Sequence, residues 1–246
     1  MHIQIAAEKL FSIGSLPVTN ALLASWAVVI ILIATAQILS RRLRLVPSLF
    51  QNIAETGIEK LLGMMEKIFG SRSKAEKYFP IIATIFIFVL ISNWLGILPG
   101  VGSIGFYEGH AGEQLFVPFV RSAASDLNFT IALAVTTVIL VNIAGIRALG
   151  AKVHFSKYFN FSNPIKFFVG ILELLGELAK MISFSFRLFG NVFADEVLLI
   201  IVAFLAPYFI PIPFLMLEIF VGFIQALVFS MLSLVFVSMA VSHEEH

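Results

Sequence analysis

Three apolar stretches, residues 21–39, 78–98 and 127–146, limit what this chain can fold into. Each contains about 20 residues, which as a helix is enough to cross the roughly 30 Å hydrocarbon core of a bilayer. Hydrophobic residues make up 59% of the chain and charged residues only 13%, whereas soluble domains contain about 25% charged residues. The sequence therefore predicts an all-α polytopic membrane protein, with residues 1–246 forming a single membrane domain.

The last third of the chain does not divide into ordinary spans. Asn163 and Pro164 suit an N-cap and a first helical residue, and no strong turn signal follows until Pro207. A helix over 164–206 would be about 64 Å long at 1.5 Å per residue, which is too long to stand upright. Together with a second helix over 212–241, it should form a long, strongly tilted hairpin. These two helices bring the expected number of membrane crossings to five.

Residues 50–69, between the first two spans, have the pattern of an interfacial amphipathic helix that lies on the membrane. The apolar residues Phe50, Ala54, Ile58, Leu61, Leu62, Met65, Ile68 and Phe69 recur at helical spacing against Gln51, Glu55, Glu59, Lys60 and Glu66.

The basic residues predict the orientation of the chain. Eight Lys or Arg lie within 40–78 and four within 147–166, whereas the loop 99–126 contains only Arg121. The positive-inside rule then places residues 1–20 outside and the C-terminus in the cytoplasm. Residues 1–20 show no cleavage site, so we expect direct insertion, which favours a bacterial plasma (inner) membrane over an organellar one.

Several classes of function find no support in the sequence. A net charge of +1 without a basic groove does not suit nucleic-acid binding. The absence of Cys excludes disulfides and thiolate metal sites, and the five His residues lack metal-ligand spacing. There is no phosphate-binding loop or nucleophile motif. We expect no metal, no cofactor and no catalysis by this chain alone.

Arg187 is a permanent positive charge inside the apolar segment 183–191, with the sequence SFSFRLFGN. A charge at the centre of a membrane helix costs about 2.5 to 3.5 kcal/mol even on the lenient insertion scale, so an intramembrane Arg indicates a functional site. At 100° per residue it shares one helical stripe with other polar residues, which should face protein or water: Glu173, Glu177, Lys180, Asn191 and Asp195.

Acidic and amide groups continue on the opposite helix of the hairpin. Glu218, Gly222 and Gln225 follow at i, i+4 and i+7, and this face is expected to meet Glu196 or Arg187. Glu196 is nine residues from Arg187, about 13 Å along the helix and on its other side, so it cannot pair with that Arg.

Separated carboxylates inside a membrane suit an ion path, because each can hold and release a proton. A fixed positive charge in the middle would block a continuous path for cations. The combination predicts two partial paths, joined only by a mobile carboxylate on another chain that carries the ion past Arg187.

The segment FRLFGN at 186–191, followed by Glu196 and by IQALVF at 224–229, resembles subunit a of F-type ATP synthases. The similarity covers almost the whole chain and includes NWLGILP at 93–99 and Asp126-Leu-Asn128. It implies a proton-translocating stator subunit with a ring of c subunits, peripheral-stalk b subunits and the rest of the ATP synthase as partners, within membrane lipid.

The resemblance also implies roles for individual residues. Arg187 would face the ring and separate two half-channels. The outer half-channel would include Asn191, Glu196, Glu218 and Gln225, with Asp126 and Asn128 at its entrance; Glu173 would belong to the cytoplasmic path, near Glu177, Lys180 and Ser183.

The chain departs from the family pattern at two places. Met181 follows Lys180, where many members have Pro, which bears on the local helix bend. Asp195, Glu196 and Glu218 are all acidic, where many bacterial members combine an acid with Gly or His, so the outer route can differ in detail.

Other interpretations of the same residues remain open at this stage. Arg187 could reach the headgroups from a turn at the membrane surface, Lys180 could simply neutralise Glu177, Asp126 could be only an N-cap, and Glu218 and Gln225 could be interhelical hydrogen-bonding groups. The alternative functions are a secondary transporter that binds an anionic substrate at Arg187 and a structural anchor of a membrane complex.

Overall fold

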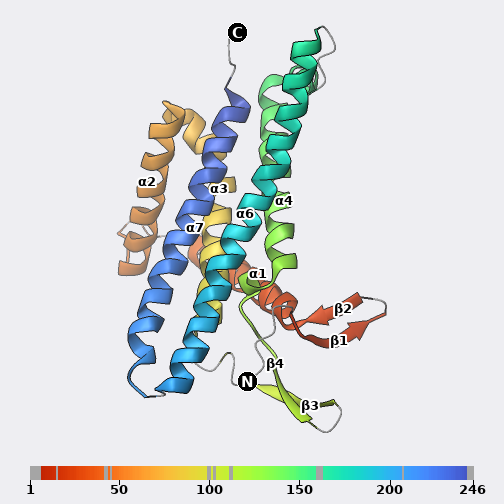
Figure 1. Cartoon of the computed structure of the whole chain (residues 1–246). Helices are drawn as coiled ribbons and strands as arrows, with labels where there is room; N and C mark the ends of the chain where they lie inside the picture. The colour runs from red at the N-terminus through yellow and green to blue at the C-terminus, as the bar shows by residue number, and fades with distance from the viewer. Residues whose placement is uncertain are drawn as a thin grey trace.

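The computed structural model describes residues 7–14, 16–41, 44, 46–98, 101, 104–110, 113–158, 163–206 and 208–242. Five of its helices are long and apolar enough to cross a membrane: α1 (Asn20–Arg41), α3 (Arg72–Ile97), α4 (Leu127–Leu149), α6 (Pro164–Leu205) and α7 (Pro211–Val241). This confirms the predicted all-α polytopic class. In Figure 1, α6 and α7 run side by side along the whole molecule, and α3 and α4 lie behind them.

The amphipathic segment forms helix α2 (Leu49–Phe69). Ser48 caps its N-terminus by accepting from the backbone N–H of Gln51, and Gly70 ends it in the left-handed conformation, with φ 66°. Its buried residues Leu61, Leu62 and Met65 belong to the same apolar cluster as residues of α3, α4 and α7. The packing of this face is therefore observed, whereas its position on a membrane surface remains a prediction.

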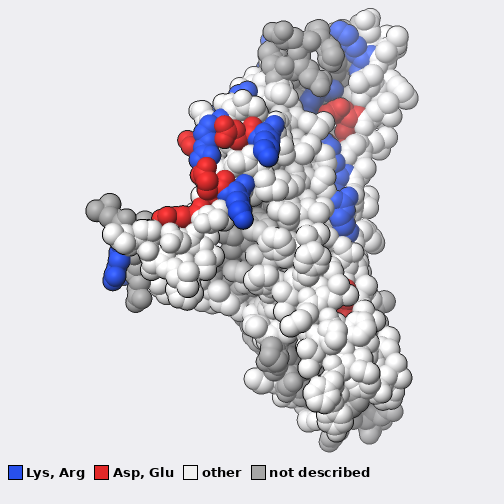
Figure 2. Space-filling model, turned by 90° about the vertical axis from the view of Figure 1, so that its left-hand side faces the viewer, with Lys and Arg blue, Asp and Glu red and all other residues white. Residues whose placement is uncertain are grey.

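The charged side chains gather over one part of the face that Figure 2 shows, and a large region of the same face carries almost none. The nearly uncharged region suits contact with lipid, because charged groups are costly inside the hydrocarbon.

Two β-hairpins were not predicted. β1 (Lys9–Ile13) pairs with β2 (Leu16–Thr19) within the stretch expected only as an external N-terminus, and β3 (Gly105–His110) pairs with β4 (Glu113–Pro118) within the loop 99–126. Asn20 joins the two regions, since its side-chain amide donates to the Pro118 carbonyl at 3.4 Å. In Figure 1 both hairpins project from the lower right of the molecule, and β1 and β2 lie next to α1.

Three shorter differences concern the ends of the spans. α3 begins at Arg72, six residues before the apolar stretch, because the charged segment before Tyr78 also favours helix. A 3-10 turn, η2 (Ala123–Ser125), precedes α4, and a short helix, α5 (Ala151–Ser156), follows it. Asp126 directly follows η2, and His154 lies in α5.

The long helix α6 contacts the rest of the chain along only one face. Phe184, Leu188 and Val192 on that face join an apolar cluster with residues of α3, α4 and α7. Ile182 and Phe186, on the other side, are 60% and 55% exposed. The chain thus leaves one long face of α6 uncovered.

Helix α3 holds α7 through two polar contacts. Asn93 donates through Nδ2 to the Gly222 carbonyl at 3.0 Å, and Trp94 donates through Nε1 to the Ile219 carbonyl at 3.0 Å. Gly222 allows this approach, because a Cβ there would lie 3.3 Å from Asn93 Cβ. The NWLG segment is therefore a packing motif that fixes α7, which carries Glu218 and Gln225.

We expect Gly96→Ala to destabilise the protein by about 1 to 3 kcal/mol, the usual cost of overpacking. A Cβ at this position would lie 2.5 Å from Ser122 Cβ and 3.1 Å from Ser122 Cα. The thermal midpoint of the purified protein in detergent measures the change.

The matched control is Gly57→Ala, a helical glycine whose added Cβ would meet nothing within 4 Å. That variant should be at least as stable as the native protein, since Ala favours helix over Gly. Equal midpoints for the Gly96 and Gly57 variants would contradict the close contact between α3 and Ser122.

Candidate functional site

Arg187 lies on the uncovered face of α6. Its guanidinium donates to Ser183 Oγ at 3.1 Å, one turn earlier on the same helix. Within the described part of the chain, no carboxylate lies within ion-pair distance of it. The positive charge is therefore held by its own helix and directed away from the chain's core.

One turn beyond Arg187, a hydrogen bond joins the two long helices. Asn191 Nδ2 donates to Gln225 Oε1 at 2.8 Å. Gln225 is buried, and its Nε2 has no hydrogen-bond partner in the described structure. We expected this face of α7 to meet Glu196 or Arg187, but the hydrogen bond joins Gln225 to Asn191. The free N–H donors of Gln225 can bind a water oxygen.

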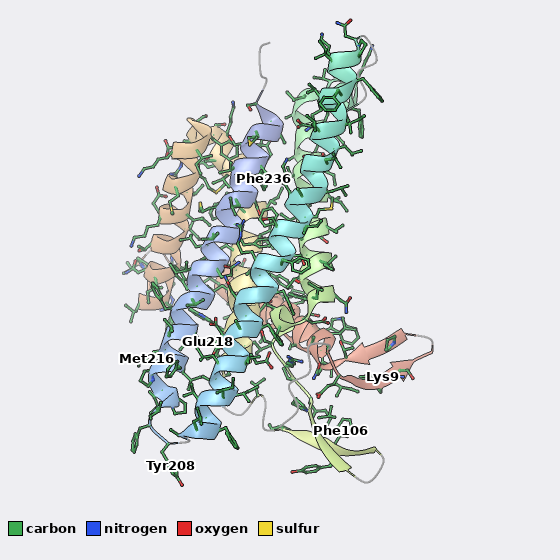
Figure 3. The ribbon with its side chains drawn as sticks, viewed as in Figure 1. Lys9, Phe106, Tyr208, Met216, Glu218 and Phe236 are labelled. Atoms are coloured by element: carbon green, nitrogen blue, oxygen red, sulfur yellow. The ribbon has the colours of Figure 1, made fainter. Side chains whose placement is uncertain are left out.

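Three acidic side chains lie closer to the α6–α7 turn. Glu218 is close enough to Asp195 and Glu196 for their charges to act on it, and its Oε2 is buried without a hydrogen-bond partner in the described structure. Figure 3 shows Glu218 on the part of α7 nearer to Tyr208 and the turn, whereas Phe236 lies toward the other end. The acids therefore form a group separate from the residues near Phe236.

Glu196 has a cationic partner that was not predicted. Arg121 donates through Nε to Glu196 Oε1 at 2.9 Å and through a second nitrogen to Oε2 at 3.2 Å. The two side chains are 12% and 27% exposed. Since Arg stays protonated, this two-point contact is a charge-assisted ion pair that fixes the position of the Glu196 side chain. The only clue in the sequence was that Arg121 is the lone basic residue of its loop.

We expect Arg121→Gln to destabilise the protein by about 1 to 3 kcal/mol, because a partly buried carboxylate would lose charged hydrogen bonds. The thermal midpoint of the purified protein reports this loss. Adding Glu196→Gln to the same chain should recover most of it, since the double variant contains no uncompensated charge. Independent, additive effects of the two substitutions would show that the pair is not coupled.

Asp126 caps helix α4, as one of the alternative interpretations proposed. Its Oδ1 accepts from the Asn128 backbone N–H at 3.0 Å and from Asn128 Nδ2 at 3.3 Å. Asp126 is buried, whereas Asn128 is exposed. The pair thus has a clear structural role, and a role at a channel entrance stays a prediction.

Glu173 and Glu177 lie in different environments near the start of α6. Glu173 is 44% exposed and 3.9 Å from Lys157 Nζ. The side chain of Glu177 is 11% exposed, and it accepts from Lys180 Nζ at 2.8 Å. The stripe predicted for α6 is thus divided: Glu173, Arg187 and Asn191 are exposed, whereas Glu177 is turned inward toward α4.

A polar network that was not predicted surrounds Glu177. Asn142 of α4 donates through Nδ2 to Glu177 Oε2 in a long contact of 3.5 Å. The Oδ1 atom of Asn142 lies 2.9 Å from His154 Nε2 and 3.2 Å from Tyr158 Oη. We expected His154 in a loop, but it lies in α5 and is only 2% exposed.

Two pKa shifts fix the donors in this network. Burial, and then the charge of Lys157, lower the pKa of His154, against an opposing effect of Glu177. Burial raises the pKa of Tyr158. At neutral pH the phenol is therefore protonated and the imidazole is neutral, so both can donate to Asn142 Oδ1. The amide orientation then aims Nδ2 at Glu177.

A groove of about 260 Å³ lies between α6 and α7. Lys180, Ser183 and Arg187 line it from α6, and Leu232 and Phe236 line it from α7. Lys180 Nζ also lies 4.8 Å from the Phe236 ring centre. The groove extends from Arg187 to Lys180, the partner of Glu177, and it is large enough to hold several waters. Among the described residues, no group of three or more His, Cys, Asp or Glu could hold a metal ion.

The sequence profile of the family described as ATP synthase A chain matches residues 22–238. The chain belongs to the ATP synthase A chain family. It is 32% identical over 230 residues to ATP synthase subunit a of Moorella thermoacetica, covering 94% of both chains. It is 35% identical over 223 residues to ATP synthase subunit a of Campylobacter concisus, covering 89% of this chain and 88% of the relative. In this chain, the groove and the three acids lie on α6 and α7, the two helices that carry the FRLFGN and IQALVF segments.

Proposed function

We propose that this chain is the proton-translocating membrane subunit of an F-type ATP synthase and that it is not catalytic alone. Its membership of the ATP synthase A chain family is the observation that carries this proposal. Five helices that can cross a membrane agree with a multi-pass subunit. ATP chemistry takes place on other chains of the complex.

The chain provides two half-channels, one on each side of Arg187. Asn191, Gln225 and the acids Glu196 and Glu218 belong to the outer half-channel, with Asp126 and Asn128 near its entrance. Glu173 and Glu177 are the two carboxylates available to the inner one, and Lys180 lies beside Glu177. The groups near the α6–α7 turn and those near the start of α6 are separate in the structure, which supports two paths rather than one pore.

The moving partner is a ring of c subunits on the uncovered face of α6. Gly176 and Gly190 lie on α6, and a Cβ at either position would meet nothing within 4 Å in this chain. Small residues let another helix approach closely in a membrane. An ionised ring carboxylate is attracted to Arg187 there, and a protonated one can move on into lipid.

Protonation steps on the two sides then drive rotation in one direction. A proton enters from outside, neutralises a ring carboxylate near Glu218, and leaves toward the cytoplasm nearly one turn later. Each charge that moves down 100 mV releases about 2.3 kcal/mol, so several protons are needed for one ATP. The peripheral-stalk b subunits hold the chain against this rotation.

The chain lies in a bacterial inner membrane, and the basic loops support an orientation with the N-terminus outside and the C-terminus in the cytoplasm. The groups of the outer half-channel then lie toward the outside, near the α6–α7 turn. The Glu177 network lies toward the cytoplasm. Protease protection of tags at the two termini in oriented vesicles tests this orientation.

Vesicles that carry the assembled complex provide the functional test. An imposed ΔpH should drive both proton uptake and ATP synthesis with the native chain, and neither when the complex is prepared without it. Undiminished synthesis without the chain would contradict the proposal. Proton uptake that needs an anionic solute would favour the transporter interpretation.

A further inference from the structure

The chain offers two carboxylates for the inner half-channel, and they differ in surroundings. Glu173 lies on the exposed side of α6, and its nearest cation, Lys157, is 3.9 Å away. Glu177 is buried, and Lys180 and Asn142 both donate to its carboxylate. His154 in turn contacts the side-chain amide of Asn142. A buried carboxylate with such fixed partners has a defined geometry, whereas an exposed one does not.

The groove between α6 and α7 extends from Arg187 to Lys180, which is the ion-pair partner of Glu177. Arg187 and Ser183 line one part of it, and Gly176 and Lys180 line another. Lys180 Nζ is 2.8 Å from Glu177 Oε1, so the carboxylate lies directly beyond the groove. Glu177 is ten residues from Arg187, about 15 Å along the helix, and waters in the groove can bridge this distance.

We propose that Glu177, held by Lys180 and by an Asn142–His154–Tyr158 network, is the group that receives the proton from the ring, and that the inner path thus turns into the chain instead of following Glu173. This inference rests on the proposed function. The ring carboxylic acid gives its proton through groove water to the Glu177 carboxylate and becomes the anion that Arg187 attracts. Glu177 then gives the same proton to cytoplasmic water and returns to its ionised form.

Lys180 and Asn142 make Glu177 ready for this step. Lys180 Nζ donates to Glu177 Oε1 at 2.8 Å and so fixes the position of the carboxylate. Oδ1 of Asn142 lies within hydrogen-bond distance of His154 Nε2 and accepts from Tyr158 Oη. Its Nδ2 donates to the Val138 carbonyl at 2.9 Å and reaches Glu177 Oε2 at 3.5 Å. Lys157 and Glu173, which face the same network, add one charge of each sign.

His154 acts as a positioning residue in this arrangement. Its ring lies over Gly145 of α4, where a Cβ would come within 2.7 Å of both Cε1 and Nδ1 and 3.0 Å from the Ala240 carbonyl of α7. The missing side chain at Gly145 therefore lets the ring reach Asn142 with Nε2. Because this contact joins α4, α5 and α6, it holds the inner end of the path in place.

The contributions of Glu177 and Glu173 can be compared by measuring passive proton conduction through the membrane sector. The measurement uses vesicles from which the catalytic head has been removed. Glu177→Gln should lower conduction about tenfold, the size expected when a proton-exchanging group is lost. The variant Glu173→Gln should lower conduction clearly less than Glu177→Gln does. Glu177→Asp, which retains a carboxylate, should recover most of the conduction and so exclude a folding defect.

Native conduction in Glu177→Gln, or an equal fall in both Gln variants, would overturn the proposal.

His154→Ala should also lower conduction, and His154→Gln should restore it, because the Gln amide can still donate to Asn142. If His154→Gln does not restore conduction, His154 has no part in the inference. If Arg187→Ala abolishes ATP synthesis while Glu177→Gln conducts normally, only this inference fails. If Arg187→Ala leaves synthesis unchanged, the proposed function itself fails.

Discussion

ATP synthesis driven by an imposed ΔpH should fall at least about 100-fold in Arg187→Ala, the loss expected when a preorganised charge at a reaction site is removed. Arg187 has no carboxylate partner within the described part of the chain, and it faces outward from α6 beside Ser183. Without its charge, a ring carboxylate has no reason to lose its proton at this position. Protons could also pass directly between the two half-channels.

The same preparation contains the controls for this result. The amounts of the other subunits that co-purify with the variant should equal those of the native complex, since Arg187 makes no contact that the fold needs. Arg147→Ala removes an exposed Arg at the end of α4 and should leave synthesis unchanged. A complex that fails to assemble with the Arg187 variant would instead support the anchor interpretation.

Glu218→Gln should lower both ATP synthesis and ATP-driven proton pumping by about tenfold to 100-fold, as expected for the loss of a group that exchanges protons. Arg121 binds Glu196 at two points, so both oxygens of that carboxylate already have a partner. Glu218 has a buried oxygen with no partner in the described structure and lies within reach of two further negative charges.

Glu218→Asp keeps a carboxyl group and should retain most of the activity that Glu218→Gln loses. The proton-conducting role of Glu218 would be contradicted by normal pumping in Glu218→Gln. If Glu218→Asp and Glu218→Gln were equally impaired, the side chain would matter for packing between α6 and α7 and not for proton exchange.

The membrane helices could be predicted because their signal is local. A stretch of about 20 apolar residues can satisfy its backbone in lipid only as a helix or in a closed barrel, so composition and length are sufficient. The long helix α6 (Pro164–Leu205) follows from Asn163-Pro164 at its start and from the absence of turn signals. The two β-hairpins could not be predicted in this way, because their strands are short and lie in segments with mixed composition.

The candidate residues could be found in the sequence, but their partners could not. Arg187 and the acids are conspicuous because charge is rare in apolar segments. The contact between Arg121 and Glu196 joins residues 75 positions apart, and the network of Asn142, His154 and Glu177 joins three helices. Helical spacing relates residues only within one helix, so it placed Glu177 in a stripe with Arg187 although its side chain is turned toward α4.

Arg187→Lys gives the most direct test of the claim that a permanent charge separates two proton paths. ATP synthesis and proton uptake would be measured in the same vesicles under the same ΔpH, with the native chain as the reference. A Lys can lose its proton in a buried site whereas an Arg cannot, so the account predicts that the variant assembles but makes almost no ATP per proton taken up. A native ratio of ATP to protons in Arg187→Lys would contradict it.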